Sequence, residues 1–258
     1  MEVNGEKMVK RINSEMRSSL LDYLNYDKYV NAYIISAIFN HISNFHYEVQ
    51  LDKNNNIKGI ASIWEEDKAV TLRGKRGFCR KWFNKLCDKY DFYDLEESLI
   101  YDLMGKDSCN LFEKKILYYL IMTCNSNRSI SNGETIDYKS VYKEEWNKIS
   151  QLYYEKYNIE FTDFQPQNMK WLVVYDKEDP ICNICLEKVD SKIWVLSNFY
   201  TAPHMRNIGI GTKLLKSILK DYSKNEFVLF VNIENKRAIE LYKRLGFKKH
   251  EKVGNIEL

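Results

Sequence analysis

The second half of the chain carries the clearer pattern of hydrophobic and polar positions. Short apolar or alternating runs predict strands, and apolar residues that recur every three or four positions predict amphipathic helices. Turn residues at Asp179-Pro180 and Asp190-Ser191 indicate hairpins between the middle strands. The predicted elements are, in order, a short strand near Ile136, a helix over 142–157, strands over 171–175, 181–189 and 193–201, a glycine-initiated helix that ends at Tyr222, a strand over 227–231, a helix over 236–245 and a final strand region. This order predicts a mixed α/β domain.

The first half predicts a similar order of elements, without the glycine turn. The segment from Asp52 to Asn56 is a hairpin turn signal. The stretch from Cys124 to Glu134 is the least hydrophobic part of the middle and predicts a linker, with a boundary near Ser129. We therefore expect two domains, 1–128 and 129–258. Within the first, the patterns predict helices over 17–24, 30–40, 78–90 and 111–124, and strands over 45–51, 57–64 and 69–72.

Composition and charge are those of an ordinary soluble globular protein. Hydrophobic residues make up 45% of the 258 and charged residues 29%, which leaves enough apolar surface for a core in each half. The net charge of +3 is too balanced to indicate a nucleic-acid or membrane partner. A basic stretch from Arg73 to Lys89 is interpreted as a solvated helix face, with an anionic ligand as the alternative.

The cysteines and the first residues of the chain bear on its location. Six cysteines are scattered without a framework spacing, and Met1 to Arg11 is charged and has no apolar stretch. No apolar run is long enough to span a bilayer. Cys182-x-x-Cys185 has no second pair, so buried free thiols are expected there and no metal site. These features predict a cytoplasmic protein with reduced cysteines.

The run from Arg206 to Gly211 opens a helix directly after the predicted strand that ends at Thr201. Two glycines separated by one residue let the backbone approach an anion closely. The first N–H groups of a helix have no internal partners, and the helix dipole favours negative charge there. The run therefore predicts a pyrophosphate cradle. The structural alternative is a tight strand-to-helix turn without a ligand.

A second motif follows the next strand. It runs from Asn235 to Phe247, with Ala238, Leu241, Tyr242, Leu245 and Gly246 at fixed spacings. Together with Pro203, Arg206, Gly209 and Gly211, this motif resembles the signatures of the GNAT superfamily of acyl-CoA N-acyltransferases, in the same order. The strong likeness covers roughly 192–252.

The resemblance implies a fold and a cosubstrate. The fold is a central mixed, mostly antiparallel sheet flanked by helices, with two GNAT-like domains in tandem, of which the first is degenerate and contributes to the acceptor site. The cosubstrate is acetyl-CoA. By position in the family pattern, its pantetheine arm and thioester lie against the strand residues and its pyrophosphate against the turn. The implied donor-binding residues are Phe199, Tyr200, Thr201, Arg206, Asn207, Ile208, Gly209, Ile210, Gly211, Thr212, Asn235 and Ala238.

The resemblance also implies a catalytic residue. It places the Tyr242 hydroxyl beside the CoA sulfur, where a phenol can donate a proton to the departing thiolate. The general base is open, because the strand 193–201 has no acidic residue, unlike many members of the family. Candidates are His204, Glu160, Asp163 or a water relay. The alternative for Tyr242 is an aromatic core residue.

The leading hypothesis is an N-acetyltransferase that acetylates a primary amine of an unidentified acceptor by direct attack. It would act as a monomer or a homodimer and use no metal. A CoA-binding sensor or regulator with little or no catalysis is the alternative, favoured by the missing acidic base. A third interpretation, in which the basic helix of the first half recruits RNA, requires strongly salt-dependent binding.

Overall fold

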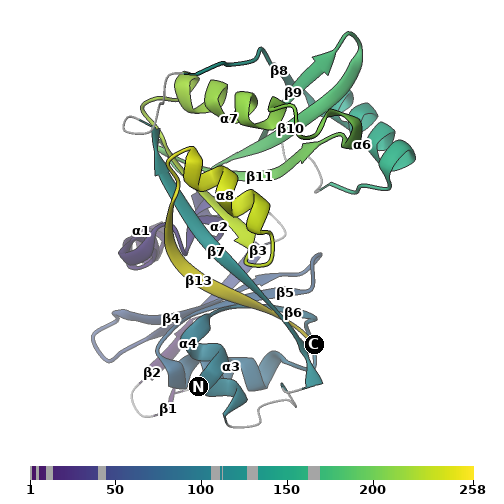
Figure 1. Cartoon of the computed structure of the whole chain (residues 1–258). Helices are drawn as coiled ribbons and strands as arrows, with labels where there is room; N and C mark the ends of the chain where they lie inside the picture. The colour runs from purple at the N-terminus through teal and green to yellow at the C-terminus, as the bar shows by residue number, and fades with distance from the viewer. Residues whose placement is uncertain are drawn as a thin grey trace. The chain divides into compact units, whose positions relative to one another are not determined.

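The chain divides into two compact units. The computed structural model describes residues 2–3, 6–9, 14–39, 45–105, 111, 113–126, 133–161 and 169–258. One unit comprises Met1–Leu120 and Glu251–Leu258, and the other comprises Ile121–His250 (Figure 1). The predicted boundary near Ser129 lies outside the described residues, and the roles assigned to the two domains stay predictions.

The second unit is built on a mixed sheet flanked by helices. Its strands lie in the order β12-β11-β10-β9-β8, with β11 parallel to β12 and antiparallel to β10. Two long helices follow the sequence pattern, α6 after β8 and α7 after the glycine turn. The elements are β8 (Lys139–Val141), α6 (Lys143–Tyr157), β9 (Met169–Asp176), β10 (Asp179–Lys188), β11 (Ile193–Thr201), the 3-10 turn η3 (Pro203–Met205), α7 (Ile210–Asp221), β12 (Glu226–Asn232) and α8 (Lys236–Arg244).

Aromatic packing holds α6 to this sheet. Trp146 on α6 stacks on Trp171 of β9, with ring centroids 3.4 Å apart. Tyr153, two turns further along α6, packs edge-on against Tyr200 of β11, with ring centroids 5.3 Å apart. Because side chains alternate along a strand, Tyr200 faces this cluster while its neighbours Phe199 and Thr201 face α7, where they lie against Gly211. One strand therefore connects the core under α6 to the surface around the glycine turn.

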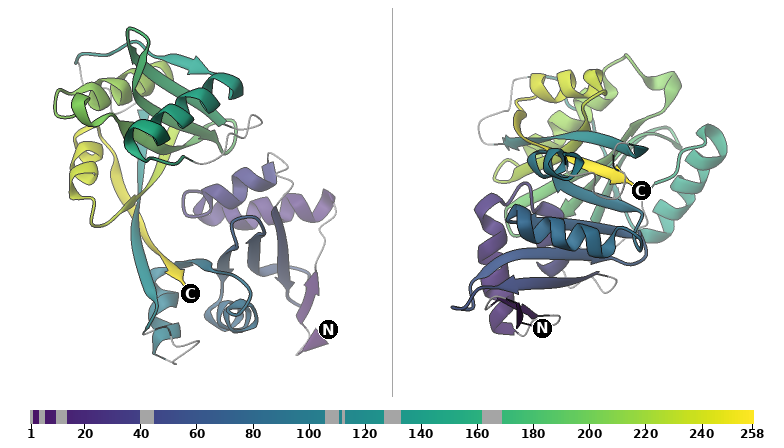
Figure 2. Two further views of the ribbon diagram at one scale, coloured as in Figure 1. Left: turned by 90° about the vertical axis from the view of Figure 1, so that its right-hand side faces the viewer. Right: turned by 90° about the horizontal axis from the view of Figure 1, so that it is seen from below.

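The strands of the first unit lie in the order β1-β2-β3-β4-β5-β6-β13. Figure 2 shows the ribbon from two further sides. The expected hairpin turn is present, since Asp52 Oδ1 accepts hydrogen bonds from the backbone N–H groups of Asn54 and Asn56. The elements are β1 (Glu2–Val3), β2 (Glu6–Val9), α1 (Ser14–Leu24), the 3-10 turn η1 (Asn25–Asp27), α2 (Ala32–Phe39), β3 (Phe45–Leu51), β4 (Ile57–Trp64), β5 (Ala69–Gly74), α3 (Arg76–Leu86), β6 (Phe92–Glu96), α4 (Glu97–Met104), β7 (Lys115–Asn125), which continues into the second unit, and β13 (Lys248–Glu257).

A buried arginine fills a gap between two strands of the first unit. β5 and β6 are parallel and pair from Ala69 with Phe92 to Thr71 with Asp94. Just beyond, the side chain of Arg73 is fully buried. Its guanidinium donates to Asp94 Oδ2 at 2.7 Å and to the Asp94 carbonyl at 3.1 Å, and its Nε donates to Asn31 Oδ1 at 3.2 Å. The interpretation of Arg73 as part of a solvated basic face is therefore wrong.

Other expectations also need correction. The segment 111–124, predicted as a helix, contains the strand β7, and the strand expected near Ile136 begins at Lys139. Asp179 and Pro180 belong to β10, because the turn lies one step earlier, at 177–178. Neither β6 nor α4 was predicted.

The cysteines differ in part from expectation. Cys87 is disulfide-bonded, contrary to the prediction that all thiols are reduced. Cys79, Cys124, Cys182 and Cys185 are free and buried. Within the described ranges, no helix has both the length and the apolar character needed to cross a membrane. The cytoplasmic location stays a prediction.

Candidate functional site

The site begins where β11 leaves its parallel neighbour. β11 pairs with β12 from Ile193 to Leu196, and no pair between them is recorded further along in the described residues. On the other side, the register between β10 and β11 shifts between Asn183 and Cys185. The extra residue is on β11, where Asn198 has a positive φ of 49° and its carbonyl accepts from the Asn183 amide at 2.8 Å. β11 therefore splays away from β12, and Phe199 to Thr201 have no recorded strand partner on the β12 side.

The glycine turn has the backbone that the sequence predicts. Gly209 has a φ of +85°, a conformation that favours glycine, and caps α7. A Cβ on Gly211 would lie 2.8 Å from the Phe199 ring and 3.2 Å from Thr201 Oγ1, so only glycine fits here without repacking. The first helical hydrogen bond runs from Lys213 N–H to the Gly209 carbonyl. The N–H groups that precede it at the start of α7 are available to an anion.

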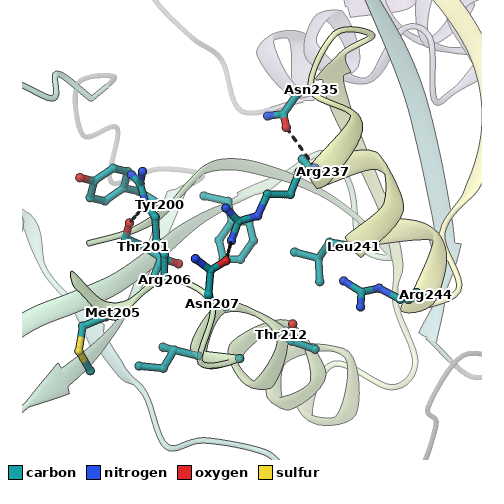
Figure 3. Close-up of a pocket in the computed structure, with 15 residues that line it drawn as sticks. Tyr200, Thr201, Met205, Arg206, Asn207, Thr212, Asn235, Arg237, Leu241 and Arg244 are labelled. Carbon is teal, nitrogen blue, oxygen red and sulfur yellow. Dashed lines mark hydrogen bonds between the residues drawn. The ribbon is translucent and has the colours of Figure 1, made fainter. Parts of the chain in front are cut away.

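A cavity of about 510 Å³ lies between this turn, the end of β11 and α8 (Figure 3). Every residue predicted to bind the donor lines it except Ile208, which is 60% exposed. Four further lining residues were not predicted. They are Met205, Arg237, Leu241 and Arg244. Of the three on α8, only Leu241 lies one helical turn from a predicted residue, Ala238, so helical spacing is the signal that would have found it.

The charge of the cavity lining is positive. Three arginines line it, and no Asp or Glu stands among the lining residues that belong to the described part of the chain. The Arg206 Nε donates to the Thr201 carbonyl at 2.9 Å, and its guanidinium carbon lies 5.4 Å from the centre of the Tyr200 ring. Arg237 donates to Asn207 Oδ1 at 2.6 Å, which links α8 to the glycine turn. This lining suits an anionic ligand.

Asn235 and Tyr242 occupy the two ends of α8. Asn235 caps the helix as expected, because its Oδ1 accepts from the Ala238 N–H at 3.1 Å. Tyr242 is 8% exposed and packs between Phe199 and Phe247, with ring centroids 6.5 and 5.6 Å away. Burial raises the pKa of the Tyr242 hydroxyl to about 12, since it disfavours the phenolate. The Tyr242 hydroxyl is therefore protonated at neutral pH, and its ring lies next to Phe199, which lines the cavity.

Of the candidate bases, the two that the structure describes, His204 and Glu160, are not among the lining residues of the cavity. His204 is exposed, and its Nδ1 lies 3.4 Å from the Tyr157 hydroxyl. Glu160 is exposed on the segment after α6. Asp163 lies outside the described residues. The identity of a base therefore stays open at this point.

Comparisons with known proteins agree with this geometry. Residues 135–247 match the model of the acetyltransferase (GNAT) family. The second unit therefore carries a match to the GNAT family. The match includes the glycine turn, the splayed strand and α8. The GNAT family uses acetyl-CoA as its cosubstrate.

A relative in Methanocaldococcus jannaschii is named as an N-acetyltransferase. It is 28% identical over 156 residues, which cover 53% of this chain and 66% of the relative. The chain thus matches just under two thirds of that protein's length.

Solved structures show that the GNAT fold extends beyond the matched residues. A Drosophila protein has a TM-score of 0.70 at 12% identity, over 98% of this chain and 99% of its own. A GCN5-related N-acetyltransferase from Sphaerobacter thermophilus has a TM-score of 0.61 at 9% identity, over 100% and 96%. At these identities the likeness concerns the fold alone. It is consistent with two GNAT-like domains in tandem.

Proposed function

We propose that the protein is an N-acetyltransferase that moves the acetyl group of acetyl-CoA to a primary amine. The observation that carries the proposal is the single cavity shared by the glycine turn, the free edge of β11 and α8. The turn holds the pyrophosphate through the N–H groups at the start of α7. Arg206 adds a charge-assisted contact.

The free edge of β11 holds the other end of the donor. Beyond Leu196, backbone groups of Phe199 to Thr201 are not used by β12, so they can bond the pantetheine amides. A backbone N–H there stabilises the oxyanion that forms when the amine attacks the thioester carbon. The arrangement supports direct transfer, with no acyl group on the protein.

Tyr242 protonates the leaving group. The amine nitrogen bonds to the carbonyl carbon, the carbon–sulfur bond breaks, and the thiolate takes the phenol proton, which solvent then restores. The raised pKa of Tyr242 keeps this proton in place at neutral pH. The amine loses its own proton to water, since no carboxylate stands among the residues that line the cavity.

Substitution of Tyr242 by Phe tests this role. We expect kcat to fall by about a hundredfold or more, because general acid catalysis contributes that much, while the Kd for CoA stays within about twofold. Release of CoA thiol with a panel of primary amines measures kcat, and calorimetry measures Kd. Tyr222→Phe is the matched control, because Tyr222 lies in the same unit and packs on Trp194 away from the cavity. An unchanged kcat in Tyr242→Phe contradicts the assignment.

A CoA-binding sensor is the second candidate. The lack of a carboxylate among the described residues that line the cavity favours it. Under this function the wild-type protein binds CoA, yet no amine in the panel releases CoA thiol faster than the hydrolytic background. The same assay thus separates the two functions.

A further inference from the structure

The cavity carries more positive charge than a pyrophosphate at the glycine turn requires. The turn already offers the N–H groups at the start of α7, its helix dipole and Arg206. Arg237 and Arg244 come from another element, α8, and line the same cavity (Figure 3). No Asp or Glu among the described lining residues balances the charge of these two arginines.

In the bonds of the described residues, neither guanidinium donates to a carboxylate. Arg237 bonds a neutral amide, Asn207 Oδ1. Arg244 donates only through Nε, to the Glu240 carbonyl at 3.4 Å, in the bonds recorded for the described residues. The Glu240 carboxylate is engaged instead by Lys243, at 2.8 Å. The two terminal nitrogens of the Arg244 guanidinium are therefore available to a ligand.

Helical spacing directs both arginines to one side. Arg237, Leu241 and Arg244 are four and three positions apart, so they share one face of α8, with Leu241 between the two cations. Two guanidinium groups on one face suit a doubly charged phosphate monoester, because each can bind phosphate oxygens through paired N–H groups. The face lies beside the turn that holds the pyrophosphate, at the site already proposed.

We propose that Arg237 and Arg244 form a second phosphate subsite, which takes the 3′-phosphate on the ribose of CoA and selects CoA over its dephosphorylated form. This inference rests on the proposed function, since it assigns a further part of the same donor. Arg244 is the specificity-determining residue. Arg237 also positions the glycine turn through Asn207.

Calorimetry with CoA and 3′-dephospho-CoA tests the subsite. The wild-type protein is expected to bind CoA about tenfold more tightly or better, as a charge-assisted hydrogen bond predicts. Arg244→Gln removes most of this preference by lowering the affinity for CoA, and leaves the affinity for 3′-dephospho-CoA unchanged. Lys243→Gln, next in sequence and paired with Glu240, retains the preference.

The outcomes separate this inference from the proposed function. Equal affinity of the wild-type protein for both compounds overturns the subsite and leaves the function standing. The subsite is also overturned if Arg244→Gln loses the same amount of affinity for CoA as for 3′-dephospho-CoA. Failure of both compounds to bind the wild-type protein overturns the proposed function itself. Because Arg244 is exposed, unchanged thermal melting of Arg244→Gln shows that the comparison concerns binding.

Discussion

At the scale of single residues, burial decides the chemistry of Tyr242. An ordinary tyrosine has a pKa near 10, and desolvation between Phe199 and Phe247 raises that of Tyr242 to about 12. A raised pKa means that the protonated form is favoured in the folded protein. The proton needed by the thiolate is therefore present below pH 10 and is lost only as the pH approaches 12.

The pH dependence of kcat follows from this. We expect no decline of kcat between pH 8 and pH 10 from the ionisation of Tyr242. Stopped-flow assays at saturating acetyl-CoA, with an amine acceptor held in its neutral form, measure it. A descending limb centred near pH 9 that disappears in Tyr242→Phe would show that the hydroxyl titrates much lower than its burial predicts.

At the scale of elements, the glycine turn and β11 depend on each other. Gly209 is needed for its positive φ, and no atom crowds a Cβ there, whereas Gly211 is needed for space beside Phe199 and Thr201. The same strand end is shaped by Asn183, which holds the bulge at Asn198. The glycine turn and the unpaired edge of β11 therefore depend on the same contacts.

Alanine at each glycine separates the two requirements. Gly209→Ala is expected to cost about 1–2 kcal/mol of stability, because it forces a left-handed backbone on alanine. Gly211→Ala is expected to weaken CoA binding by about tenfold, since the Phe199 ring must move and overpacking costs about 1–3 kcal/mol. Thermal melting and calorimetry give the two quantities. Equal behaviour of both variants in both measurements would contradict the distinction.

Local patterns in the sequence predicted the elements whose partners are near in the chain. The bounds of β3, β4 and β11 agree with the pattern, as does the start of α8. β7 was mistaken for a helix because its apolar run, with buried Ile121 and Met122, has no strict alternation. β6 was missed because Asp94 is unusual in a strand, and its partner Arg73 is 21 positions away.

The candidate site likewise contains residues that the sequence predicted and residues that it did not. The motif residues were brought together because their spacings are short and fixed. Arg237 and Arg244 stand at positions that the motif leaves free, so only the packing of α8 against the turn showed that they line the cavity. The bulge at Asn198 leaves no mark in the sequence either, since it depends on a hydrogen bond from Asn183 of another strand.

At the scale of the whole molecule, the buried side chain of Arg73 connects several elements of the first unit. Its guanidinium also donates to the carbonyls of Leu72 and Val30, so it ties β5, β6 and the start of α2 together. Arg73→Met is expected to cost about 3–5 kcal/mol, because it leaves Asp94 without its partner. Chemical denaturation measures this, and Arg73→Met with Asp94→Asn should recover part of the loss. A cost below 1 kcal/mol would contradict the role.

The buried guanidinium of Arg73 also bears on how many CoA molecules one polypeptide can bind. In both units a parallel strand pair parts after three or four residues, β5 from β6 and β11 from β12. In the second unit the parting borders a cavity, whereas in the first the protein's own side chain occupies it. We therefore expect a binding stoichiometry of one CoA per polypeptide, although the strand arrangement occurs twice.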